Sequence, residues 1–388
     1  MQKSNKMGTM PIPALLGDMA LPIMASMLVQ ALYNIVDSMY IARMVEKEEA
    51  LSAISISFPL QMLIISVSVG TAVGANALIS RLLGEKQRDK ASDAAKNSIF
   101  LCSIYGIFFF VFAAFFITPY FDFMTKNQTI VTMGTSYSKI CLMCAIFPVY
   151  SIIGERILQS TGRTVFSMIC QMGGALINII LDPIFIFGYF GFPAMGTVGA
   201  AIATVLGQFF CFFMVSYFNF KKNTDLDFNF KGFKPNKQII KDIYKVGLPS
   251  IIMQSMGSFM NMGLNSVVAS YDVIAISVLG IYFKLQSFVF MPVFGLANAM
   301  ISIVSFNYGA KNKARILKTI SLSIVIAAII LTLGTVIFIC YPQWLLINMF
   351  DATDTMLKIG IPALKTIALG FIPASVTIIL SSGFQAFG

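Results

Sequence analysis

The sequence predicts an all-α protein that crosses a membrane many times. The chain of 388 residues is 57% hydrophobic and 11% charged, with a mean hydropathy of +0.82. A soluble domain carries about a quarter charged residues. Apolar runs of about twenty residues, long enough to cross a bilayer as helices, recur from end to end. The alternating segments typical of a membrane β-barrel are missing from the sequence.

Polar breaks divide the apolar runs into about ten spans, which we expect to be helical. The expected spans are 14–41, 50–81, 94–118, 130–157, 165–188, 195–218, 239–270, 273–305, 314–341 and 352–387. Several exceed the ~20 residues that a bilayer requires, so we expect tilts or kinks. Prolines inside the spans mark the expected kinks: Pro22, Pro59, Pro148, Pro249, Pro292, Pro362 and Pro373.

The basic residues predict the orientation in the membrane. Most of the 27 Lys and Arg residues lie at the N-terminus and in alternate breaks, within 81–96, 156–163, 221–245 and 311–318. The positive-inside rule places these segments, and the N-terminus, in the cytoplasm of a multi-pass cell-membrane protein. Because topology accounts for the net charge of +10, we expect no nucleic-acid partner.

One apolar phrase occurs twice, as GANALIS at 74–80 and as LANAMIS at 296–302. Asn76 and Asn298 occupy the same place in the two copies, 222 residues apart. The small residues around them permit close helix approach, and an asparagine in lipid needs a partner helix. We therefore interpret both asparagines as equivalent helix-packing residues.

The repeat extends beyond this phrase. Leu21-Pro22 matches Leu248-Pro249, and Gly84 with its basic followers matches Gly309. Matches in the same order indicate a repeat of six helices, and an even number of spans gives both copies the same orientation. We expect two lobes related by a pseudo-two-fold axis along the membrane normal, 1–220 and 239–388, with a cytoplasmic linker at 221–238. A substrate path between two lobes is typical of transporters.

Carboxylates inside the apolar runs predict a coupling site in the first lobe. Asp37 and Asp182 lie at similar depth, because both helices run outward and both residues lie a few residues before a helix end. Asn178 lies one turn from Asp182, while Asn34 and Gln30 share a face with Asp37. Such a cluster can hold a proton or, when deprotonated, a hard cation. Ionisable residues in a membrane are functional by default.

The chain has no histidine, so any proton must be carried by carboxylates. A membrane-embedded transferase or hydrolase would need an aspartate cluster for a metal or a histidine-based group. Neither is present in the sequence. We therefore predict that the protein is not an enzyme and has no cofactor or metal beyond H⁺ or Na⁺ as coupling ion.

Four stretches together resemble the MATE family of multidrug and toxin extrusion transporters, in the bacterial branch with DinF-like and MepA-like proteins: ALPIMASMLVQALYNIVDSMYIAR, SFPLQMLIISVSVGTAVGANALISRLLGEKQ, NIILDPIFIFG and GAAIATVLGQ. The resemblance implies twelve helices in two lobes around a central cavity. It also implies that Asp37, Asn178 and Asp182 form a cation site in the first lobe, with Thr204 as a fourth member. Because the chain ends after the tenth span, we expect the second lobe to be incomplete, with its first four helices only.

Other polar residues inside the spans have two interpretations each. Glu155 forms either a structural ion pair with Arg156 or a relay. Lys284 and Lys365 lie near mid-membrane in the second lobe, where they either face a wet cavity or pair with acids of the first lobe. Thioether and aromatic side chains suit a promiscuous substrate cavity. The candidate lining residues are Met27, Tyr33, Met62, Met253, Met256, Met260 and Tyr282.

The predicted function is export of lipophilic, often cationic drugs or toxins by a monomeric secondary antiporter in exchange for H⁺ or Na⁺. The alternative is a lipid-linked oligosaccharide flippase of the same superfamily. Such flippases often line their cavity with arginines that hold pyrophosphate, whereas the spans of this chain are poor in arginine. The residues therefore favour the drug antiporter.

Overall fold

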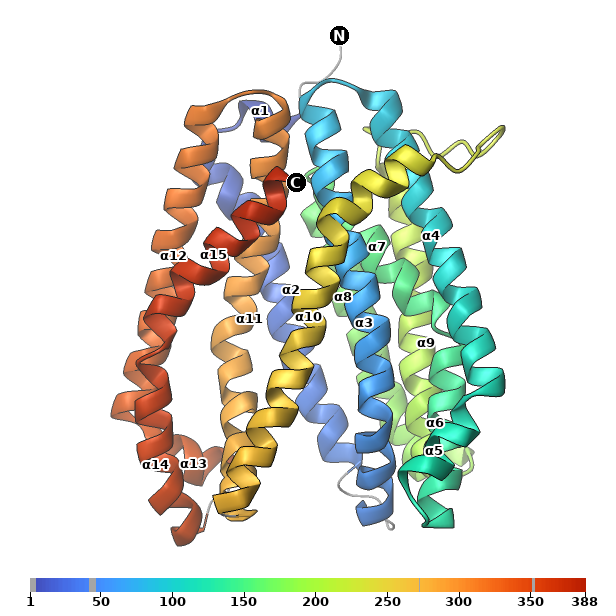
Figure 1. Cartoon of the computed structure of the whole chain (residues 1–388), viewed down its shortest axis with the longest axis vertical. Helices are drawn as coiled ribbons and strands as arrows, with labels where there is room; N and C mark the ends of the chain where they lie inside the picture. The colour runs from blue at the N-terminus through green and yellow to red at the C-terminus, as the bar shows by residue number, and fades with distance from the viewer. Residues whose placement is uncertain (1–4, 42–46, 272, 351–352) are drawn as a thin grey trace.

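The computed structural model describes residues 5–41, 47–271, 273–350 and 353–388. Within these ranges every regular element is helical, which confirms the predicted all-α fold. Seven described helices are long and apolar enough to cross a membrane, and two bent helix pairs provide up to two further spans. The helices stand side by side along the long axis of the molecule (Figure 1).

The elements are α1 (Lys6–Thr9), α2 (Ile12–Ile41), α3 (Lys47–Gly84), α4 (Arg88–Phe115), α5 (Ile117–Met124), α6 (Gln128–Met143), α7 (Ile146–Ser160), α8 (Thr164–Phe187), η1 (Tyr189–Gly191), α9 (Gly196–Tyr217), η2 (Phe218–Lys222), α10 (Lys237–Tyr271), α11 (Val273–Gly309), α12 (Lys313–Cys340), α13 (Pro342–Phe350), α14 (Asp354–Ala368) and α15 (Phe371–Phe387).

Two of the predicted spans are not single helices. The run 130–157 contains α6 and α7, which are bent by 45°, and the run 352–387 contains α14 and α15, bent by 49°. Each second helix has a proline at its third position, Pro148 in α7 and Pro373 in α15. A proline inside a helix removes a backbone donor and clashes with the preceding turn. A new helix that starts just before the proline avoids both costs, since first-turn N–H groups need no helical acceptor.

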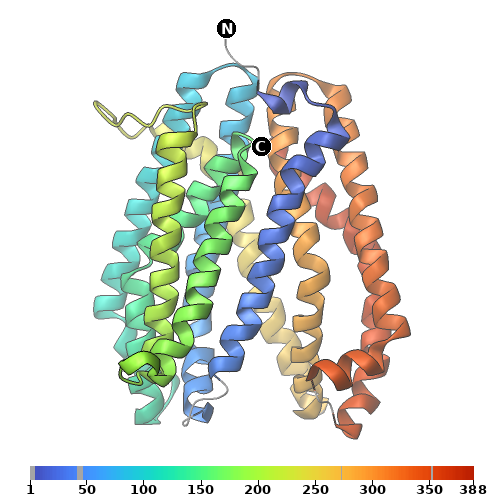
Figure 2. The ribbon, with the colours of Figure 1, turned by 180° about the vertical axis from the view of Figure 1, so that it is seen from behind.

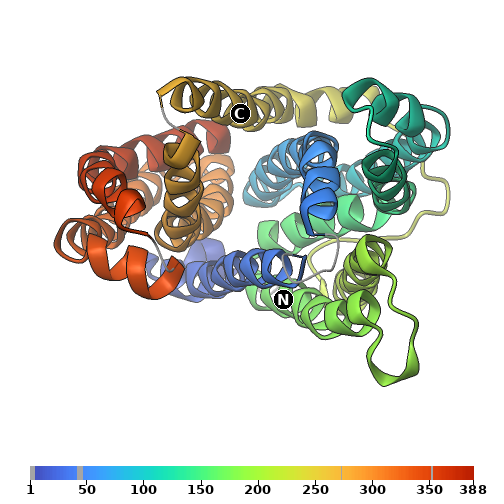
Figure 3. The same ribbon diagram turned by 90° about the horizontal axis from the view of Figure 1, so that it is seen from below.

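The helices form two groups, α3–α9 and α11–α15, which lie on opposite sides of the molecule (Figure 3). The helices α2 and α10 lie at opposite edges between the groups. Each of them packs against the other half of the chain, α2 on α11 and α10 on α3. The first half of α2 is also part of the core of the second group, since Leu16 and Met19 are buried in one cluster with Leu296 and Met300 of α11.

The ends of α3 and α11 cross at two glycines. A Cβ atom on Gly84 would lie 1.9 Å from the carbonyl oxygen of Phe306, and one on Gly309 would lie 2.1 Å from the carbonyl oxygen of Arg81. Both distances are too short for any side chain, so the crossing requires glycine on both helices. The two contacts are reciprocal, because Phe306 follows Arg81 by 225 residues and Gly309 follows Gly84 by 225. Reciprocal contacts are those of a two-fold axis.

The same separation of 225 residues relates other features of the two halves. Lys86 and Lys311 both have a left-handed backbone, with φ of 62° and 56°. Ser80 donates a hydrogen bond to the carbonyl oxygen of Ser160, and Ser305 donates one to that of Ala386. These pairs fix the structural register of the repeat.

The repeated phrases lie outside this register, since Asn76 and Asn298 are 222 residues apart. Asn76 is fully buried and accepts a hydrogen bond from Ser302 of α11 at 3.0 Å, so it joins the two halves as expected of a packing residue. Asn298 is only half-buried, and no side-chain hydrogen bond holds it within the described part of the chain. The two asparagines therefore differ in role, although their local sequences are alike.

The N-terminal segment 5–10 lies across both groups at this same end (Figure 2). Arg315 of α12 donates to the carbonyl oxygens of Met7 at 2.9 Å and Met10 at 2.8 Å. On the other side, the Asn5 amide donates to the carbonyl oxygen of Thr161, between α7 and α8, at 3.4 Å. The segment therefore connects the two groups where α3 and α11 cross.

We expect Gly309→Ala to destabilise the protein by about 1–3 kcal/mol, because the new methyl group forces α3 and α11 apart. Gly280→Ala on the same helix is the matched control, since a Cβ there meets no atom within 4 Å. That change should stabilise the helix by up to about 1 kcal/mol. Thermal unfolding in detergent measures both, and equal shifts in Tm would contradict the assigned crossing.

Candidate functional site

The candidate site begins with a buried polar stripe on α8. Asn178 and Asp182 are one helical turn apart, and both are buried within the bundle. Pro183 follows directly and lies inside the helix, where it leaves one backbone carbonyl without its usual donor. The two predicted residues are therefore on one face of α8, turned away from lipid.

A close crossing of two helices brings Thr204 of α9 to this stripe. A Cβ on Gly207 would lie 2.8 Å from the carbonyl oxygen of Gly174 and 3.1 Å from the Cβ of Asn178. The absence of side chains at Gly174 and Gly207 allows α8 and α9 to touch through their backbones, as small residues do in membrane helix pairs. Thr204, one turn before Gly207, consequently lies beside Asn178.

The Asn178 amide joins the two helices. In the orientation that satisfies both of its ends, the amide nitrogen donates to Asp182 Oδ2 at 2.8 Å and the amide oxygen accepts from the backbone N–H of Thr204 at 3.0 Å. The Thr204 hydroxyl also lies 3.3 Å from this amide. The structure thus brings Asn178, Asp182 and Thr204 together, as the family resemblance implied.

The carboxyl group of Asp182 has an unused acceptor. The residue has no exposed surface, yet its Oδ1 finds no hydrogen-bond partner among the described residues. A buried oxygen without a donor is costly. A proton on the carboxyl group, or a cation beside it, would remove that cost.

Helix α2 contributes the second carboxylate. Asp37 is half-buried and lies within electrostatic range of Asp182. Tyr33, one turn earlier, hydrogen-bonds to Thr204 and is close to both aspartates, so it is part of this cluster rather than only a lining candidate. Gln30 is half-buried on the same helix, whereas the side chain of Asn34 lies outside the described residues.

Sequence reasoning missed three members of the surroundings. Tyr137 of α6 is buried near Asp37 and accepts a hydrogen bond from Gln61 of α3 at 2.9 Å. Cys141 lies one turn further along α6, in contact with Tyr137. Gln61 was the available signal, because a glutamine within an apolar span needs a buried polar partner.

Glu155 lies apart from this cluster, nearer the end of α7 that faces the α7–α8 turn. Its carboxylate accepts a hydrogen bond from the thiol of Cys211 at 3.4 Å. Arg156, its neighbour in sequence, donates to Gln159 at 3.1 Å instead, and no ion pair joins Glu155 to Arg156 in the described part of the chain.

The predicted residues of the second half are not gathered in one site. Lys284 of α11 and Lys365 of α14 are both exposed. Met253, Met256 and Met260 project from the exposed face of α10, while Met27 and Met62 are half-buried. Tyr282 was predicted to line the cavity, but it is packed in the apolar core of the second group because it lies on the inward face of α11.

The cluster combines two carboxylates with amide, hydroxyl and phenol groups inside an apolar bundle. Such a group of oxygens can exchange a proton or coordinate a hard monovalent cation. It contains no nucleophile paired with a base. The arrangement is that of an ion site in a polytopic membrane transporter.

Comparison with known proteins agrees with this class. The sequence profile of the MatE family matches residues 22–184 and 249–388. The multidrug export protein MepA of Staphylococcus aureus (strain MRSA252) is 29% identical over 323 residues, which are 83% of this chain and 68% of that protein. MepA of Staphylococcus haemolyticus is 29% identical over 80% of this chain and 68% of its own length.

Solved structures give the same result. An outward-facing multidrug resistance MATE family transporter is 26% identical and aligns with a TM-score of 0.94 over all of this chain and 85% of its own. A MOP superfamily transporter from Pyrococcus furiosus is 27% identical, with a TM-score of 0.91 and the same coverage. The chain belongs to the MatE family, which confirms the resemblance noted in its sequence.

We expect Gly207→Ala to destabilise the protein by about 1–3 kcal/mol, because the methyl group would press on the Gly174 carbonyl and on Asn178. Gly173→Ala is the matched control on α8, since its Cβ meets only the edge of the Phe210 ring at 3.1 Å. Thermal unfolding in detergent compares the two variants. A Gly207→Ala protein as stable as the Gly173→Ala protein would show that the tight crossing does not position the site.

Proposed function

We propose that this protein is a secondary antiporter that exports lipophilic, often cationic drugs in exchange for H⁺ or Na⁺. The observation that carries the proposal is the buried pair Asp37 and Asp182 with the unpartnered Oδ1 of Asp182. Its relatives, which are named multidrug export proteins, support a drug-like substrate. Its similarity to MATE transporters supports an ion-coupled mechanism.

Coupling requires that the ion site and the drug path respond to one another. An ion shifts a conformational equilibrium only by its difference in affinity for the two states. In our proposal the cluster between α2, α8 and α9 changes shape when it gains a proton or cation, because Asn178, Thr204 and Tyr33 must rearrange around the neutralised carboxyl group. That change moves α2, which also packs on α11.

Access would alternate by parting the two groups at the end where they now meet. The crossing of α3 with α11 and the N-terminal segment close that end. The similarity to an outward-facing MATE family transporter supports the opposite end as the open one. Release of the Gly84 and Gly309 contacts would then open the closed end.

The closed end faces the cytoplasm in this proposal, and so does the N-terminus. The turns at that end carry Lys86 and Arg88 between α3 and α4, Arg163 between α7 and α8, and Lys311 between α11 and α12. An excess of basic residues in the connecting turns is the usual mark of the cytoplasmic side.

We expect Asp182→Asn in the full-length protein to abolish uphill export while the protein still folds. Asparagine keeps the shape of the side chain but cannot carry an exchangeable charge. The assay is efflux of a fluorescent lipophilic cation from proteoliposomes, first under an imposed pH gradient and then under a Na⁺ gradient. The gradient that drives the unaltered protein identifies the coupling ion.

Asp122→Asn is the matched control, because Asp122 of α5 is an exposed carboxylate. It should leave efflux unchanged under both gradients. Normal uphill efflux from the Asp182→Asn protein, at equal abundance in the vesicles, would remove Asp182 from the coupling site.

A further inference from the structure

The connection between η2 and α10, residues 223–236, is rich in lysine and phenylalanine and has no part in the ion site. Together with the residues that border it, it contains Lys221, Lys222, Lys231, Lys234 and Lys237. Its aromatic residues are Phe228, Phe230 and Phe233, with Phe220 just before it. The only acids between Lys221 and Lys237 are Asp225 and Asp227.

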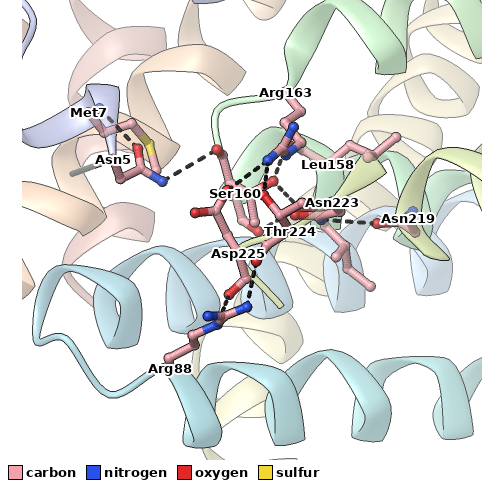
Figure 4. Close-up of polar contacts among 12 residues, drawn as sticks. Asn5, Met7, Arg88, Leu158, Ser160, Arg163, Asn219, Asn223, Thr224 and Asp225 are labelled. Atoms are coloured by element: carbon pink, nitrogen blue, oxygen red, sulfur yellow. Dashed lines mark hydrogen bonds and ion pairs between the residues drawn. The ribbon is translucent and has the colours of Figure 1, made fainter. Parts of the chain in front are cut away.

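Two arginines hold the start of this loop against the first group of helices (Figure 4). Arg163 donates to the hydroxyl of Thr224 at 2.8 Å and forms an ion pair with Asp225 at 3.2 Å. Arg88 of α4 donates to the carbonyl oxygen of Asp225 at 3.0 Å. The charge of Asp225 is therefore already compensated inside the protein.

The rest of the loop is fixed in the same way. The backbone N–H of Asp227 donates to Ser92, and that of Asn236 donates to Asn97, each at 2.9 Å. The Asp227 carboxylate accepts from the backbone N–H of Asn229 at 3.0 Å. Both acids of the segment thus have partners, and the loop is held in one conformation rather than hanging free.

The tip of the loop presents what remains. Phe230 is 38% exposed, and Lys231 and Lys234 are exposed on either side of Gly232, whose φ of +74° makes the turn. Lys237 and Lys241, one turn apart at the start of α10, continue the exposed basic face. The loop projects sideways beyond the helices at the end of the bundle that carries the N-terminus (Figures 1 and 2).

We propose that residues 228–241 form a docking surface for the headgroups of anionic phospholipids. A loop that extends sideways from the end of membrane-spanning helices lies over the lipids around the bundle. Exposed lysines there contact phosphates, each stabilising the contact roughly five-fold. Phe230 enters the boundary between headgroups and acyl chains. The leaflet is the cytoplasmic one if the orientation proposed above holds, but the docking itself does not depend on that orientation.

The position of the loop favours a lipid over a soluble partner. Phe230 and Phe220 expose apolar surface among lysines, the composition typical of segments that lie in the membrane interface. The loop is also rigid and beside the bundle, so bound lipid would contact α4 and α10 at once. Lipid charge could then bias the contact between α10 and α3 that the proposed conformational change must alter.

The test uses tryptophan fluorescence in the full-length protein. The chain has one tryptophan, Trp344, so a Trp344→Phe, Phe230→Trp variant reports on the loop alone. This protein is reconstituted in vesicles of phosphatidylcholine and phosphatidylglycerol in which one or the other lipid is brominated. We expect brominated phosphatidylglycerol to quench the introduced indole more than brominated phosphatidylcholine at the same mole fraction, and we expect salt to reduce the difference.

Two lysine variants distinguish specific docking from general attraction. Lys231→Gln with Lys234→Gln and Lys237→Gln should abolish the preference for phosphatidylglycerol. Lys126→Gln with Lys358→Gln, exposed lysines in other connections, should leave it unchanged. Equal quenching by both lipids would overturn the proposal. Absence of quenching by either would also overturn it and would assign the loop to water or a soluble partner. Neither result depends on drug export, so failure here is separable from failure of the antiport proposal.

Discussion

The approach of α3 to α11 is the contact on which the rest of the arrangement depends. Lipid tails are as apolar as the helices, so burial alone does not hold membrane helices together, and close backbone packing must do so. Gly84 and Gly309 permit that packing, and each lies against a carbonyl oxygen of the other helix. With the groups joined at this end, the ion site on α8 and α9 remains within one group while α2 reaches into the other.

Much of the fold could be predicted because a bilayer leaves few choices. Apolar length predicted the spans, and the spacing of Asn178 and Asp182 predicted a shared face, since both follow from helix geometry. The breaks before Pro148 and Pro373 were less accessible, because a proline permits either a kink or a new helix. Only the packing of α6 and α7 around their bend selects between the two.

Contacts between helices distant in the sequence could not be read from one chain. The repeated phrase suggested that Asn76 and Asn298 are equivalent, but the crossing glycines set a register three residues away from it. Tyr137 and Gln61 are unremarkable in sequence and meet only because α6 packs on α3. The assignment of Tyr282 to a cavity failed for the same reason, since the face that α11 turns inward depends on its neighbours.

The burial of the first half of α2 among α11 and α12 has a consequence for biogenesis. This helix leaves the ribosome first, yet its partner Met300 follows Met19 by more than half of the chain. During that interval its inward face can meet only lipid or the insertion machinery. Quality control therefore has a natural signal, because a chain interrupted before α11 keeps α2 without its partners and remains recognisable as unfinished.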